Sequence, residues 1–206
     1  QAAASADFSM VYPNFSLQAQ YRIIQPYYRS MGIAMFLSDL QSIMVSPSFS
    51  FFKHKIQFTN SFQTQHDNLN KYKIFTTHRN IINSTLSVNP NNTFGIDISY
   101  SGFNLDQKKN QLKASDSTRL AQQSNTITIM PRLMFVKQNF SDVVSLATSF
   151  TNINNKVSVQ DPIKTTNFYT TLTNIISLAK SGWSFTAGLN YNAAKSAGID
   201  LISTGG

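Results

Sequence analysis

The residues that could carry acid–base or nucleophilic chemistry are few, and their spacing assembles no recognisable site. The three histidines are His54, His66 and His78, and Asp67 adjoins His66. Together with the many serines, they could supply a Ser-His-Asp arrangement, but nothing singles out one serine as a nucleophile. Glutamate is absent, and the nine acids are all aspartates, so no paired-carboxylate site stands out. We expect no enzyme, with an integral-membrane hydrolase as a distant alternative and solvated histidines as the plain interpretation.

Composition removes further classes of site. Zero cysteines exclude disulfides, cysteine-ligated zinc and a thiol nucleophile, and the 8 glycines form no phosphate-binding motif. We therefore expect no metal and no cofactor. The formal charge is +8 and the pI is near 9.7, but the Lys and Arg residues are scattered, which argues against nucleic acid as a partner. We expect these charges to attract anionic lipid headgroups or glycolipid phosphates instead.

Apolar and polar residues alternate through most of the chain. The clearest case has apolar residues at alternate positions from Trp183 to Tyr191, with Ser, Thr, Gly and Asn between them. Successive side chains leave a β-strand on opposite faces, so a period of two indicates strands. No window shows sustained helical periodicity. The sequence predicts ten strands, at about 6–12, 15–25, 43–52, 55–66, 80–88, 93–102, 125–136, 143–152, 167–179 and 183–193.

The connections between these segments are alternately tight and long. The tight connections carry turn-forming or charged residues and lie at 13–14, 53–55, 89–92, 138–142 and 180–182. The long links are largely polar and lie at about 26–42, 67–79, 103–124 and 153–166. Outer-membrane barrels have short turns at one rim and long loops at the other. The pattern therefore predicts an all-β, antiparallel, up-and-down transmembrane β-barrel, in which the unusually apolar first link folds inward or extends the next strand.

Strand length and aromatic placement agree with this fold. A strand of about 10 residues tilted near 45° crosses about 23 Å, close to the roughly 25 Å apolar band of such barrels. Aromatic residues gather near the strand ends, as two interfacial girdles require. The girdle candidates are Phe15, Phe51, Phe94, Phe135 and Trp183 near the tight turns, and Tyr100 and Tyr191 near the long links. The alternative explanation is that aromatic residues are simply favoured in strands.

Three charged residues lie on the polar parity of their strands: Arg22, Asp97 and Arg132. A charge facing lipid at the midplane costs roughly 2–4 kcal/mol, so we expect all three to face the lumen. Asp97 and Arg132 stand at similar distances from tight turns on neighbouring strands, so they are expected either to approach each other or to be solvated separately. Pro47 and Pro131 lack an N–H donor, and each should lie at a bulge or near a rim.

Part of the chain resembles a known group of proteins. The runs Gln25–Gly32, Phe36–Leu40 and Pro47–Lys55 place a proline, aromatics, a basic residue, a serine and a glycine before a strand pair with a Lys-containing turn, and Ser99–Phe103 follows. These runs resemble a segment of large, mostly uncharacterised outer-membrane β-barrel proteins of Bacteroidota-type bacteria. The resemblance spans about residues 24–130 and implies location and architecture, but no defined activity. The third long link is shorter and more basic here, so no loop partner is carried over.

We therefore expect residues 1–206 to form one domain, an outer-membrane β-barrel of about ten strands or part of a larger barrel, since 197–206 begins a further strand. The expected function is that of a porin-like pore or of a structural subunit in a transport or secretion assembly. Outer-membrane lipid and other subunits of such an assembly are the expected partners, and nucleic acid is not. The alternative is a secreted all-β sandwich acting as a binding or adhesion module.

Overall fold

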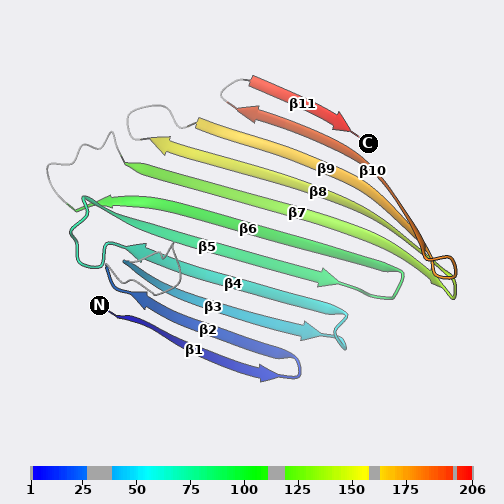
Figure 1. The fold of residues 1–206 in the computed structure, drawn as a ribbon, viewed down its shortest axis with the longest axis horizontal. Coiled ribbons are helices and arrows are strands. Elements are labelled where there is room, and N and C mark those ends of the chain that lie inside the picture. The colour runs from blue at the N-terminus through cyan, green and yellow to red at the C-terminus, as the bar shows by residue number, and fades with distance from the viewer. Residues whose placement is uncertain (1, 27–38, 111–118, 158–162, 197–198, 206) are drawn as a thin grey trace.

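A single antiparallel sheet of eleven strands makes up the computed structural model, which describes residues 2–26, 39–110, 119–157, 163–196 and 199–205. The strands lie side by side in sequence order, so the sheet is an up-and-down meander (Figure 1). No helix occurs among the described residues. The strands are β1 (Ala3–Tyr12), β2 (Phe15–Ile24), β3 (Leu40–Phe51), β4 (Ile56–Asp67), β5 (Phe75–Val88), β6 (Phe94–Lys109), β7 (Leu120–Lys137), β8 (Phe140–Val157), β9 (Ile163–Leu178), β10 (Trp183–Ser196) and β11 (Ile199–Gly205).

The predicted all-β meander is confirmed, and its strands are longer than the sequence suggested. β6 continues to Lys109 and β7 begins at Leu120, within a stretch predicted to be a long loop. The link predicted at 67–79 likewise shortens to 68–74. These extensions are polar, and ladder hydrogen bonds need only backbone groups, so a strand continues past the point where apolar alternation stops. Most of the apolar first link, 27–38, lies outside the described residues.

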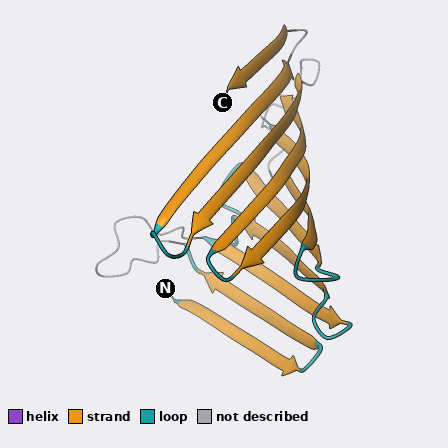
Figure 2. Cartoon of the chain, turned by 90° about the vertical axis from the view of Figure 1, so that its right-hand side faces the viewer, coloured by secondary structure: helices purple, strands orange, loops and turns teal. Residues whose placement is uncertain are grey.

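The sheet is open, not closed into a barrel. β1 pairs only with β2 and β11 pairs only with β10. Figure 2 shows the strand direction turning progressively across the sheet, as the regular twist of β-sheets requires. The described strands therefore do not form the predicted closed barrel.

Both strand prolines interrupt the ladder without a bulge. Pro47 pairs with Leu17 of β2, but the β3–β4 ladder skips from Val45–Phe62 to Ser48–Thr59. The β7–β8 ladder skips the positions around Pro131 in the same way, with unchanged register on either side. Of the two expected settings, the bulge is absent, because the missing N–H donor removes pairing on one side of the strand only. Both prolines instead lie toward the tight-turn rim, where they pair with the third residue of the neighbouring strand, Leu17 of β2 and Ile96 of β6.

The sheet has no second layer to bury its side chains. Only two hydrophobic residues of the described chain, Ile24 and Leu40, are buried. A soluble sandwich would bury the inner faces of two sheets against each other, and the described strands form one sheet. The predicted alternative of a sandwich is therefore not what these strands form.

Candidate functional site

The cross-strand registers sort side chains into two faces. Directly paired residues of an antiparallel ladder project to the same side, so each rung can be followed from strand to strand. Phe15 pairs with Phe49, and Phe49 pairs with Phe58; the centroids of these ring pairs lie 5.0 and 6.5 Å apart. The same rung continues through Leu86, Ile98 and Ile129. We call the face that carries this rung the apolar face, and the opposite one the polar face.

The apolar face is uncovered. Its largest side chains are exposed to a degree that a folded core would not permit: Trp183 by 63%, Leu189 by 64% and Phe185 by 55%. Comparable exposure recurs across the sheet, at Phe8, Tyr21, Ile43, Phe62, Ile127, Leu133, Leu146, Phe150, Phe168 and Leu172. Soluble monomers rarely expose contiguous apolar patches beyond a few hundred Å². This face therefore requires an apolar environment.

The apolar belt on this face ends before the strands do. On β8 it runs from Phe140 to Phe150, with Asp142, which accepts a hydrogen bond from Asn174 Nδ2, and Thr148 on the same parity; the following residues of that parity include Asn152 and Asn154. Those eleven positions span about 23 Å across a membrane at the usual rise and a 45° tilt. On β6 and β7 the belt likewise gives way to Asn, Asp and Gln toward the long connections. The apolar region is thus a band with one boundary inside the sheet.

The predicted girdle residues all project from the apolar face. Phe15, Phe51, Phe94, Phe135 and Trp183 occupy it at the tight-turn end, and Tyr191 lies toward the other end. Tyr100 was predicted to lie near a long link, but it lies near the middle of β6, because this strand continues to Lys109. Tyr100 donates its hydroxyl to Asn125 Oδ1 at 2.9 Å. Its ring lies over Gly102, where a Cβ would approach the Tyr100 hydroxyl to 2.8 Å. The hydroxyl therefore faces the polar margin while the ring belongs to the belt.

The polar face is lined by hydroxyl and amide side chains that bond across strands. Ser46 bonds to Ser61 and Ser48 to Thr59, each at 3.1 Å. Similar bonds join Thr126 to Thr151 and Thr128 to Ser149. Such a surface is suited to contact with water, since exposed hydroxyls and amides can exchange these bonds for bonds to solvent.

Asp97 and Arg132 form an ion pair on the polar face, which confirms their predicted approach. Arg132 pairs in register with Gly95, and Asp97 pairs with Met130, so the two charges are diagonal neighbours on β6 and β7. Arg132 Nη1 donates to Asp97 Oδ2, and Nη2 donates to Asn89 Oδ1 at 2.7 Å.

Gly95 makes this contact possible, because a Cβ there would meet Asn89 Oδ1 at 2.5 Å and Arg132 Nε at 2.9 Å. Arg22 shares the polar face but lies on β2, opposite Ser5 and Ser42, and so joins neither Asp97 nor Arg132.

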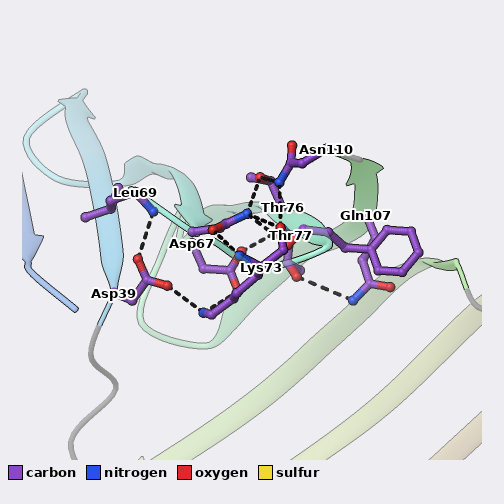
Figure 3. Close-up of polar contacts among 10 residues, drawn as sticks. Asp39, Asp67, Leu69, Lys73, Thr76, Thr77, Gln107 and Asn110 are labelled. Carbon is purple, nitrogen blue, oxygen red and sulfur yellow. Dashed lines mark hydrogen bonds and ion pairs between the residues drawn. The ribbon is translucent and has the colours of Figure 1, made fainter. Parts of the chain in front are cut away.

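A second polar cluster, which the sequence did not predict, lies at the rim of the longer connections (Figure 3). Lys73 Nζ lies 2.7 Å from Asp39 Oδ2 and 3.3 Å from Asp67 Oδ2. The other oxygens of these carboxylates accept the backbone N–H groups of Leu69, at 2.8 Å, and Thr77, at 2.7 Å. Burial lowers the pKa of Lys73, but hydrogen bonding and charge from Asp39 and Asp67 outweigh burial and raise it above its ordinary value of 10.5.

Asn68 shapes the connection between β4 and β5. It is buried and has a left-handed φ of 62°, which asparagine tolerates better than most residues. Its Nδ2 donates to Lys73 O at 3.0 Å and to Thr76 Oγ1 at 3.1 Å, and its Oδ1 accepts Lys73 N at 2.9 Å. The tip of this connection is left exposed, with Tyr72 at 77%. An Asn directly after a strand is the one local signal in the sequence for this turn.

The candidate acid–base residues lie in two separate places in the described part of the chain. His66 and His78 stack on β4 and β5 with their ring centroids 5.7 Å apart, and His54 Nδ1 lies 2.6 Å from Ser50 Oγ. No group of three or more His, Cys, Asp or Glu side chains within the described ranges could hold a metal ion. Among the residues that the structure describes, no helix is long and apolar enough to cross a membrane. The chain matches no protein-family model and none of the curated proteins with significant similarity.

Proposed function

We propose that this chain forms the wall of an outer-membrane β-barrel, which acts as a pore or as a structural subunit of a transport or secretion assembly. The observation that carries the proposal is the uncovered apolar belt on a sheet with only two buried hydrophobic residues in its described part. A bilayer supplies the apolar environment that the belt lacks within the protein. The resemblance to outer-membrane barrel proteins of Bacteroidota-type bacteria supports the same location.

The polar face becomes the lumen surface in this proposal. Arg22, Asp97 and Arg132 lie on that face, where their charges meet water. The tight turns then occupy one rim and the longer connections, with the Asp39–Lys73–Asp67 cluster, occupy the other.

Closure requires further strand pairing. In an eleven-stranded meander the first and last strands run in the same direction, so β1 and β11 cannot pair antiparallel with each other. An additional strand between these two edges, from further chain or from another subunit, would complete an antiparallel wall and remove both edges.

Membrane fractionation tests the proposal. We expect the protein to sediment with outer membranes, to need detergent for extraction and to float with liposomes after reconstitution. Leu146→Arg places a charge in the belt and should make the free energy of membrane insertion less favourable by roughly 2–4 kcal/mol. Ala147→Arg, one residue further along β8 and on the polar face, is the matched control and should insert normally. Recovery of the wild type as a detergent-free monomer would refute the proposal.

A further inference from the structure

An apolar groove lies at the tight-turn rim, between the β3–β4 turn and the β5–β6 turn. Its volume is about 470 Å³, and it is lined by Phe52, Lys53, Lys55, Ile56, Val88 and Pro90. Ile56 and Val88 are register partners on the apolar face and form its floor. The two turns are held together by a hydrogen bond from Asn89 N to Lys55 O at 2.7 Å. The groove therefore continues the apolar belt to the edge of the sheet.

The charge at the groove is of one sign. Lys53 and Lys55 are both exposed, no acidic residue lines the groove, and neither lysine belongs to an ion pair within the described residues. His54, between them, bonds to Ser50 on the polar face and leaves the groove to the lysines. An apolar floor with two unpaired cations beside it is complementary to a molecule that carries an acyl chain and a negative headgroup.

The turn that presents this site is held in an energetically costly conformation. Phe52, Lys53 and His54 have consecutive left-handed φ values of 53°, 55° and 66°, a region that non-glycine residues rarely adopt. The result is that Phe52 is 74% exposed beside the groove. Strain of this kind is concentrated at binding sites, where it holds groups in place.

We propose that this groove binds an anionic phospholipid, with one acyl chain over Ile56 and Val88 and the headgroup phosphate against Lys53 and Lys55. The inference rests on the proposed membrane function and adds to it a specific lipid site at the tight-turn rim. Lysine ammonium groups act as point charges toward phosphate, and the apolar floor distinguishes a lipid from free phosphate.

Native mass spectrometry of the full chain in nonionic detergent tests this site, with phosphatidylglycerol as the probe. We expect wild type to retain one phosphatidylglycerol and the Lys53→Gln/Lys55→Gln variant to bind it roughly 30-fold more weakly. Val88→Phe keeps both lysines and fills the groove, so it should also lose the lipid. Lys137→Gln/Lys180→Gln removes the same charge from other turns of this rim and should retain it.

Several outcomes would overturn the site. They are equal retention by the Lys53/Lys55 variant and by the Lys137/Lys180 control, equal retention of zwitterionic phosphatidylcholine, and full displacement of the lipid by inorganic phosphate. Liposome flotation of the same samples separates the two proposals. Protein that floats but shows no difference among variants refutes the lipid site alone, whereas protein that does not float refutes the membrane function.

Discussion

The Arg132 side chain passes over Gly95 to reach Asn89, and this path needs a residue without a side chain at position 95. A methyl group at this position would lie 2.5 Å from Asn89 Oδ1, so the arginine or the turn would have to shift. We expect Gly95→Ala to destabilise the protein by about 1 kcal/mol through loss of the Arg132–Asn89 contact. Gly188→Ala is the matched control, because its new Cβ would meet nothing closer than Leu172 O at 3.7 Å, and it should be neutral or slightly stabilising. Urea unfolding of reconstituted protein measures both, and equal effects would contradict this account.

The Asp97–Arg132 ion pair should contribute modestly to stability. Both side chains are partly exposed, by 21% and 35%, so solvent screens the pair and we expect a coupling energy of about 0.5–1 kcal/mol. A double-mutant cycle with Asp97→Asn and Arg132→Met measures it. Additive single effects would show that each charge is solvated separately.

We expect the β4–β5 connection to lose stability at strongly alkaline pH, because its ion pairs depend on the charge of Lys73. Its pKa is raised, so the stabilisation is fully present below its ordinary value of 10.5 and is lost as pH rises through the higher folded value. A nitroxide at Tyr72→Cys should therefore keep the same mobility through neutral pH and become more mobile in the strongly alkaline range.

The variant Lys73→Met should make the same label more mobile than in the wild type at neutral pH, by a small amount, because the half-exposed pair contributes at most about 1 kcal/mol. Lys71→Met removes a neighbouring exposed lysine that belongs to none of the ion pairs of the described residues and should change nothing. A label that loosens equally in both variants would show that the Asp39–Lys73–Asp67 cluster does not order the connection.

At the scale of elements, alternation located the strands but not their ends. The segment from Trp183 was predicted as a strand and is β10. β6 passes through Asn104 and Asp106 to Lys109 because its backbone pairs with β5 and β7, and polar side chains do not prevent that pairing. A pattern that detects an apolar face ends where the belt ends, not where the ladder ends.

A contact in the candidate site could be predicted where it depends only on the face that each residue occupies and on its distance from the nearest turn. Asp97 and Arg132 met those conditions on neighbouring strands, whereas Arg22 lies four strands from Asp97. The contact of Asp39 with Lys73 depends on two connections and on backbone conformations such as the left-handed φ of 65° at Asp39. No periodicity encodes that arrangement, so sequence alone could not reveal it.

The alternation of connections makes a prediction about topology. The chain has no cysteine, so single cysteines report cleanly on their side of the membrane. Tyr72→Cys, at the longer-connection rim, should react with an impermeant maleimide on intact cells, because long loops of such barrels face outward. Ser181→Cys, in the β9–β10 turn, should react only after the cells are opened. The reverse pattern would invert the orientation, and labelling of both in intact cells would place both rims on one side.

At the scale of the whole molecule, stability must come from the environment of the sheet. A chain with two buried hydrophobic residues in its described part has no core to offset the conformational entropy of ordering its strands. Ladder hydrogen bonds join every neighbouring pair of strands, but the outer edges of β1 and β11 need the further pairing proposed above before the sheet meets the condition for lying in lipid. In the proposed arrangement the bilayer takes the place of a core on one face, and water solvates the other.

A nitroxide scan of β8 in reconstituted bilayers tests this two-faced arrangement most directly. Single cysteines from Val143 to Phe150 would be labelled in turn, and collisions with oxygen, which partitions into lipid, would be compared with collisions with a water-soluble nickel chelate. We predict oxygen accessibility at the even positions and nickel accessibility at the odd ones, with a period of two. Labels at the even positions that are inaccessible to both reagents would place the apolar face against protein, and labels accessible to nickel throughout would contradict membrane insertion.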